Sequence, residues 1–192
     1  VLTGLTNNWA NGGELKNEGY DAAFNVKVLA LKNWKWQIGA SVGHYKNEIT
    51  ELPVVNKKKE IMTDVYGATI LTKIGEAANV FYGYETQGVF ATTEEAEAAV
   101  LYMLDDNGKT KHFFGAGDVR FVNQNPDDGG LIDENDRVVI GNPNPDFYGN
   151  ISSSLTWKHL TLDATFNYSV GNDVYNYMRS QLEGGNRFMN QS

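Results

Sequence analysis

Residues 148–170 read YGNISSSLTWKHLTLDATFNYSV, and apolar side chains recur at every second position along most of this stretch. They stand at odd positions up to Trp157 and at even positions from Leu160 to Val170. A period of two indicates a β-strand with one apolar and one polar face. The change of parity across two residues predicts a hairpin of two strands with a tight turn.

The same pattern occurs earlier in the chain. From Tyr20 to Leu31 and from Trp34 to Gly43 the even positions are mostly apolar, and only Lys32 and Asn33 separate the two runs. We therefore predict a first hairpin over residues 13–45 and a second over residues 148–170. Both tight turns then lie at one end of the strands, and the long connections lie at the other.

The connection between the hairpins, residues 46–147, is too long to be structureless in a compact domain. Alternation and local composition predict strands over 64–74, 81–90, 120–122 and 137–140. The run TTEEAEAAVLYML, residues 92–104, predicts a helix, because Thr92 and Glu95 have the spacing of a capping box. Ala96, Ala99, Val100 and Met103 would form its apolar stripe.

Composition agrees with a β-rich chain. Of 192 residues, 12% are aromatic and 20 are glycine, a combination that favours strands and turns. The formal net charge of −8 disfavours nucleic acid as a partner. There are no cysteines, which excludes disulfides and thiolate metal sites. No apolar run is long enough for a transmembrane helix, whereas a transmembrane strand needs only about 9–11 residues.

One acidic segment is a candidate metal site. Its oxygen-bearing side chains are those of Asn123, Asn125, Asp127, Asp133 and Asp136. Alternate spacing is typical of calcium loops, although this loop starts with Asn rather than Asp and spans 14 residues instead of 12. The alternative is a turn in which Asn and Asp side chains bond to nearby backbone N–H groups.

We find no catalytic constellation in the sequence. The histidines, at 44, 112 and 159, are far apart and have no partner motif, and no serine has the context of a nucleophile. We therefore predict that the chain is not an enzyme.

Three phrases resemble one protein family. They are GGELKNEGYDAAFNV with WKWQIGASVGHYKNEITEL, then ILTKIGEAANVFYGYETQGVFATTEEAEAA, and finally GLIDENDRVVIGNPNPDFYGN with the hairpin that follows. They are similar to late barrel strands and loops of SusC/RagA-like TonB-dependent outer-membrane transporters. Gly75, Phe81, Tyr82, Gly83, Tyr84, Gly88 and Phe90 match the family phrase "vG.p.g.fyGy.tdGif". The resemblance covers about residues 10–190.

The resemblance implies a mainly β fold: antiparallel β-hairpins from the C-terminal part of an outer-membrane β-barrel, with a long loop insertion that contains short strands and one short helix. Residues 1–192 would form a single partial-barrel fragment, in which 46–147 is an extracellular-type insertion and 171–192 begins the next loop. Its unpaired edges could drive self-association.

For function, the resemblance implies import of a glycan or peptide across the bacterial outer membrane. It also implies TonB as the energy source, a SusD-like surface lipoprotein as partner and the lipid bilayer as surroundings. The alternative is a secreted, calcium-stabilised β module that binds carbohydrate or protein. The two differ at the face formed by Phe24, Val26 and Val28 with Leu162, Ala164 and Phe166. A barrel exposes this face to lipid, and a soluble module buries it.

Overall fold

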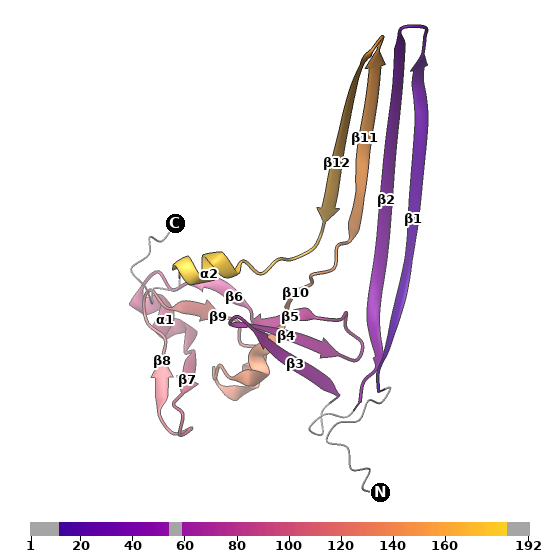
Figure 1. Ribbon diagram of the computed structural model, residues 1–192. Helices are drawn as coiled ribbons and strands as arrows, with labels where there is room; N and C mark the ends of the chain where they lie inside the picture. Colours follow the sequence, from indigo (N-terminus) through magenta and orange to yellow (C-terminus); the bar gives the residue numbers. More distant parts are fainter. Residues whose placement is uncertain (1–11, 54–58, 184–192) are drawn as a thin grey trace, which may run out of the picture.

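The computed structural model describes residues 12–53 and 59–183 and is mainly antiparallel β. A tall sheet of four long strands stands on a lobe of shorter strands (Figure 1). This arrangement confirms the predicted fold class: two hairpins joined by an insertion with its own structure.

The elements are as follows in chain order. The strands and helices are β1 (Glu14–Ala30), β2 (Trp34–Glu51), β3 (Glu60–Val65), β4 (Ala68–Lys73), β5 (Val80–Tyr84), β6 (Thr86–Val89), α1 (Thr93–Ala99), β7 (Tyr102–Leu104), β8 (Lys111–Phe113), β9 (Val119–Phe121), β10 (Arg137–Gly141), β11 (Phe147–Trp157), β12 (Leu160–Val170) and α2 (Tyr177–Glu183). Two short 3₁₀ helices, Pro126–Asp128 and Glu134–Asp136, lie in the acidic segment. Within the described part of the chain, neither α-helix is long and apolar enough to cross a membrane.

The long sheet has the strand order β1-β2-β11-β12, and all its pairs are antiparallel. The insertion leaves at the end of β2 and returns at β11, which pairs directly with β2. Both tight turns lie at the top of the sheet in Figure 1, and the insertion lies at the foot. Tight turns at one end of the sheet and the long connection at the other are therefore arranged as the sequence predicted. β2 continues to Glu51, beyond the predicted hairpin limit at residue 45.

The hydrophobic core lies in the lobe rather than under the long sheet. One small sheet has the order β10-β5-β4-β3, and two-stranded sheets pair β6 with β9 and β7 with β8. The buried hydrophobic residues are Ile49, Leu71, Val80, Phe90, Ala96, Tyr102 and Ile132. Of these, Ile49 alone belongs to the long sheet, so within residues 12–53 and 59–183 most of that sheet has no layer packed on either face.

The predicted helix over 92–104 is wrong in its second half. Thr92 caps the helix and its hydroxyl accepts from the Glu95 N–H, as expected, but α1 ends at Ala99. Val100 takes a left-handed conformation with φ of 54° and ends the helix. Tyr102 then pairs with Phe113 in a small hairpin, because this pairing buries its ring in the lobe.

Two predicted strands are each divided in the structure. The stretch 64–74 contains the end of β3, a turn at Tyr66 and Gly67, and β4. Both turn residues have positive φ, 51° and 89°, as a two-residue hairpin turn requires. The stretch 81–90 is interrupted at Glu85, between β5 and β6. The strands predicted at 120–122 and 137–140 are present as β9 and β10. Part of the predicted loop start at 171–192 lies outside the described residues.

Candidate functional site

The long sheet has one apolar face. One row across its four strands consists of Phe24, Ala40, Ile151 and Phe166, joined by the pairing register. The two neighbouring rows on this face are mostly apolar as well: Val26, Ile38, Ser153 and Ala164, then Ala22, Val42, Gly149 and Tyr168. Nothing in the described chain covers these rows, since Phe24 is 58% and Phe166 is 70% exposed. We refer to this surface as the apolar face.

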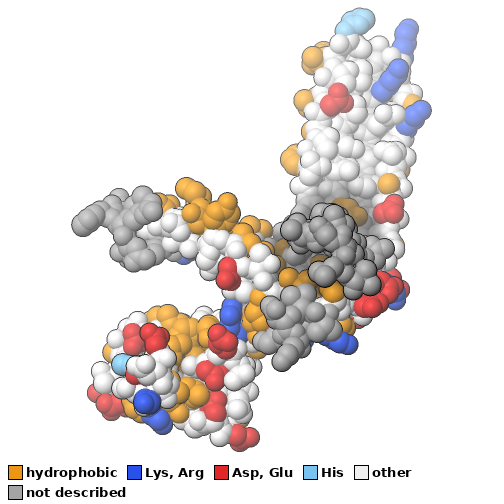
Figure 2. Space-filling model, turned by 60° about the horizontal axis from the view of Figure 1, so that its bottom comes forward, with side chains coloured by type: hydrophobic (Ala, Val, Ile, Leu, Met, Phe, Trp, Pro, Cys, Tyr) orange, Lys and Arg blue, Asp and Glu red, His pale blue; other side chains and the backbone are white. Residues whose placement is uncertain are grey.

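The centre of the opposite face is made of small residues, most of them polar. Its two central rows are Ala23, Ser41, Asn150 and Asn167, then Asn25, Gly39, Ser152 and Thr165. Neither row contains a charged residue. The side of the long sheet turned forward in Figure 2 is largely white, with a few charged side chains. The sheet is therefore two-faced, apolar on one side and hydroxyl- and amide-rich on the other.

Aromatic rings mark both ends of the apolar face. At the tight turns the Trp34 and Trp157 rings lie 5.8 Å apart between centroids, and Lys158 Nζ is 5.2 Å from the Trp157 ring. At the other end the His44 ring lies 5.3 Å from Tyr20 and 5.5 Å from Phe147.

The spacing of these two ends fits a bilayer. From Trp34 to His44 a strand extends about 33 Å at roughly 3.3 Å per residue. Tilted by about 40°, it would rise about 25 Å, which is the height of the apolar band of membrane barrels.

A polar group on the apolar face is internally satisfied. The Trp36 indole N–H donates to the Ser153 hydroxyl at 3.0 Å. In a hydrocarbon environment an indole N–H without an acceptor would cost free energy, because no water is available to replace the bond. This bond explains why a serine interrupts an otherwise apolar row.

Beyond His44 the two faces exchange character. On the side that continues the apolar face, Glu18 stands opposite Lys46 and Lys16 opposite Glu48, so this surface becomes charged. On the other side, Ile49 is only 5% exposed, and Asn47 is buried too. The membrane-like character of the sheet therefore ends at the row of Tyr20, His44 and Phe147.

The lobe covers the buried side of this end of β2. The Ile49 N–H donates to the Glu76 carbonyl, and the Ile49 carbonyl accepts from the Gly75 N–H, both at 2.9 Å. The Asn47 side-chain oxygen accepts from the Ala78 N–H at 2.9 Å. These bonds attach the turn between β4 and β5 to the extension of β2. The lobe is thus held to the long sheet where its apolar face stops.

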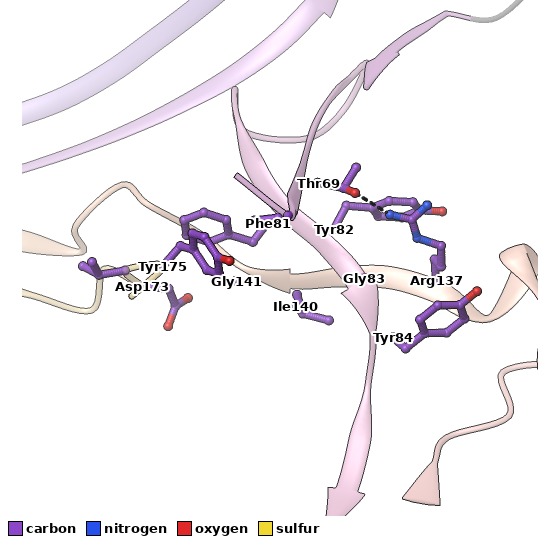
Figure 3. Close-up of a pocket in the computed structure, with 13 residues that line it drawn as sticks. Thr69, Phe81, Tyr82, Gly83, Tyr84, Arg137, Ile140, Gly141, Asp173 and Tyr175 are labelled. Carbon is purple, nitrogen blue, oxygen red and sulfur yellow. Dashed lines mark hydrogen bonds between the residues drawn. The ribbon is translucent and has the colours of Figure 1, made fainter. Parts of the chain in front are cut away.

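A cavity of about 480 Å³ lies in the lobe, lined by residues of β4, β5 and β10 and by residues 173–175. Arg137, the first residue of β10, stands opposite Tyr84 in the register and reaches toward Thr69 beside the Tyr82 ring (Figure 3). Its Nη2 donates to Thr69 Oγ1 at 2.8 Å, and its guanidinium carbon lies 4.9 Å from the Tyr82 ring centroid. Burial raises the pKa of the Tyr84 phenol, while the nearby Arg137 charge opposes that rise.

The acidic segment forms a hydrogen-bonded loop. The buried Asp136 carboxylate accepts from the N–H groups of Gln124 and Asp133 at 2.8 and 2.7 Å, respectively. Asp133 in turn accepts from the Asn135 N–H at 2.7 Å. The Asn123 amide donates to Asp128 Oδ1 at 2.9 Å, and Asp128 was not among the predicted ligands.

The predicted metal ligands are only partly brought together. The N–H of Gln124, the residue after Asn123, donates to the Asp136 carboxylate. Among the described residues, the Asp127 carboxylate takes no part in this hydrogen-bond network. Among residues 12–53 and 59–183, no group of three or more His, Asp or Glu side chains is arranged to hold a metal ion. Amide and backbone oxygens could still contribute ligands. Calcium binding by the five residues therefore stays a prediction.

The histidines remain separated in the structure. His44 lies in β2 with its Nδ1 2.6 Å from the Asp146 carbonyl, and His112 lies in β8. His159 lies in the turn between β11 and β12. The prediction that the chain is not an enzyme is unchanged by this arrangement.

Arg137 and the aromatic row at His44 were not identified from the sequence. Arg137 follows the run DEND, and nothing in that spacing marks it as part of a cavity. Tyr20 and His44 fit the alternating pattern, but only the register shows that they stand side by side with Phe147.

The chain is similar to three TonB-dependent receptors of Formosa agariphila (strain DSM 15362 / KCTC 12365 / LMG 23005 / KMM 3901 / M-2Alg 35-1). It is 26% identical to TonB-dependent receptor P3 over 189 residues, which is 95% of this chain and 18% of that protein. Identity to receptor P26 is 27% over 175 residues, 91% of this chain and 17% of the relative. Identity to receptor P39 is 28% over 198 residues, which cover 90% of this chain and 18% of the relative.

A solved structure has the same fold. The structure of the RagAB peptide transporter matches 96% of this chain and 18% of the matched chain, with a TM-score of 0.58 and 23% identity. No family model matches the chain. The chain thus spans less than a fifth of the length of these relatives. These matches confirm the resemblance to TonB-dependent transporters that the sequence phrases indicated.

Proposed function

We propose, on the premise that this chain is a relative of TonB-dependent receptors, that it forms part of the wall and an outer lobe of an outer-membrane import transporter. The observation that carries the proposal is the apolar face. It is exposed, bounded by aromatic rows at both ends, and about as tall as a bilayer's apolar core once the strands are tilted. A soluble module would have covered such a surface.

The orientation follows from the ends of the sheet. Outer-membrane barrels have short turns on the periplasmic side and long loops outside. The turns at Lys32–Asn33 and Lys158–His159 would then face the periplasm. The lobe formed by residues 59–146 would stand outside the cell, just above the row of Tyr20, His44 and Phe147.

The relatives support a proposal for the cargo and the partners. The solved relative is named as a peptide transporter, and the notable phrases of this chain resemble transporters of glycans and peptides. We propose a glycan or peptide as cargo, TonB as the energy source and a SusD-like surface lipoprotein as partner. The chain itself would provide wall and loop, without covalent chemistry.

Site-directed labelling tests the membrane assignment, and the absence of native cysteines makes it direct. Single cysteines at Ile151, Phe166, Asn150 and Asn167 would carry an environment-sensitive dye in phospholipid vesicles. We expect the dyes at 151 and 166 to be quenched by lipid-bound quenchers and those at 150 and 167 by aqueous ones. Aqueous quenching of all four positions would contradict the proposal and favour the secreted β module.

A further inference from the structure

Among residues 12–53 and 59–183, Arg137 is a cation that forms no ion pair, whereas Lys16 pairs with Glu18 and Arg120 with Glu95. Its Nη2 bonds to a neutral hydroxyl, that of Thr69, and its Nε is buried without a hydrogen-bond partner. Buried polar groups are nearly always satisfied, so this guanidinium calls for an explanation.

Two tyrosines hold the guanidinium in place. Its central carbon lies 4.9 Å from the Tyr82 ring centroid and 6.0 Å from that of Tyr84, within the range of cation–π attraction. The register fixes this geometry, because Arg137 stands opposite Tyr84 and Tyr82 is two residues away on the same strand. The planar donor fork is thus pre-oriented, and no carboxylate of the described residues forms an ion pair with it.

The cavity beside Arg137 has room for a ligand group. Its volume of about 480 Å³ falls within the range of small-molecule sites. We propose that this cavity binds a carboxylate-bearing ligand, with the carboxylate on the Arg137 guanidinium and the body of the ligand against the tyrosine rings. A planar carboxylate matches the donor fork of arginine and forms its strongest hydrogen bonds.

The surrounding acidic groups sharpen this choice. Asp173 lines the same cavity, but its Oδ2 accepts from the Asn142 N–H at 2.8 Å, and Figure 3 shows it on the other side of β5 from Arg137. Glu134, Asp133 and Asp136 lie close enough to act on Tyr84, and of these Asp133 and Asp136 already accept backbone N–H bonds. These negative charges would disfavour polyanions, so a ligand with a single carboxylate fits best.

Carboxylates occur both in acidic sugars and at peptide C-termini, and the binding test separates the two. The probes are glucuronate against glucose, and a tripeptide with a free C-terminus against its C-terminal amide, each titrated calorimetrically into the chain. We expect at least one acid to bind ten-fold or more tightly than its uncharged counterpart. Preference within one pair identifies the source of the carboxylate.

Variants test the role of the guanidinium. Arg137→Gln should abolish the preference for the acid, and Arg137→Lys should retain only part of it, since the ammonium lacks the planar fork. Arg120→Gln is the matched control, because Arg120 is paired with Glu95 at 3.2 Å and should leave binding unchanged. Circular dichroism would establish that each variant is folded.

Two results would overturn the proposal: equal affinity for the acid and uncharged forms of both pairs, or an undiminished preference in a folded Arg137→Gln variant. Should that variant fail to fold, the Arg137→Lys comparison decides. The inference rests on the proposed function in one respect: binding in this cavity would recognise cargo only if the chain is part of a transporter. Binding is measured on the chain itself, so failure here and failure of the membrane labelling are separate results.

Discussion

The two parts of β2 make an instructive comparison. From Trp34 to His44 its apolar side chains face outward on a surface that the described chain leaves uncovered, and its other face carries Lys35 and Gln37 and then glycine and serine. From Tyr45 to Glu51 the apolar side chain of Ile49 is buried under the lobe, and the opposite face carries Lys46 and Glu48. One continuous strand thus serves two different surroundings.

The difference shows that alternation alone does not tell which solvent a face meets. In both parts side chains alternate between the two faces with a period of two, and in both the apolar side chains lie on one face. What separates them is whether another part of the protein packs on that face. In the first part, we propose that lipid covers the apolar face. In the second part, the turn between β4 and β5 is seen to pack against the strand.

Of the changes considered, a charge in the middle of the apolar face should have the largest effect. Phe166→Arg should weaken partition of the chain into phospholipid vesicles by about 2–4 kcal/mol, the cost of a charge at the bilayer midplane on a barrel's lipid face. Asn167→Arg, on the opposite face of the same strand, is the matched control and should cost much less. Equal losses would show that the two faces do not differ in environment.

Ile49→Ala tests the covered end of β2. Removing this buried side chain should lower the free energy of unfolding by about 2 kcal/mol, at the low end for aliphatic core truncations. Chemical denaturation in detergent would measure it. Thr50→Ala, at the exposed neighbouring position, should cost less than half as much. No loss at Ile49 would mean that the lobe does not pack there in solution.

Ser153→Ala tests the polar bond on the apolar face. The Trp36 indole N–H would lose its acceptor, with an expected cost of about 1 kcal/mol in lipid. In vesicles the Trp36 fluorescence should shift as the hydrogen bond is lost. Ser152→Ala, on the polar face, serves as the control. A cost that is the same for both variants would argue against a lipid-exposed Trp36.

Acid should destabilise the turn that contains Asp105. N–H groups of Lys109 and Thr110 donate to the Asp105 carboxylate and lower its pKa from 3.8 to about 2. A lowered pKa stabilises the folded turn above about pH 4, and this contribution is lost as pH falls toward 2. NMR shifts of the Lys109 and Thr110 amides should follow that titration, and Asp105→Ala should remove it. Shifts centred near pH 4 would contradict this.

Calcium gives the smallest and most local test. If Asn123, Asn125, Asp127, Asp133 and Asp136 bind the ion, calcium should raise the melting temperature of the chain, and Asp136→Asn should reduce that rise. Magnesium is the control, since it needs a stricter octahedral site. Absence of both heat and stabilisation would leave the loop as the hydrogen-bonded turn seen in the structure.

Sequence reasoning was most successful where one local signal dominates. The hairpins of β1–β2 and β11–β12 could be predicted because a period of two persists through each strand. The helix over 92–104 could not, because Tyr102 gains more from pairing with Phe113 and packing in the lobe than from a further helical turn. The turn at Tyr66 and Gly67 was missed because tyrosine rarely takes positive φ.

The sequence by itself determined the class of this protein: alternating strands, tight turns at one end, a long insertion at the other, and the phrases shared with TonB-dependent transporters. Only the tertiary structure decided which rows of side chains form each face, where the apolar face ends, and that Arg137 lies beside Tyr82 and Tyr84 with no ion pair to another described residue. The physical reason is that alternation is local along one strand. Register, burial and charge pairing depend on residues about a hundred positions apart, as β2 and β11 are.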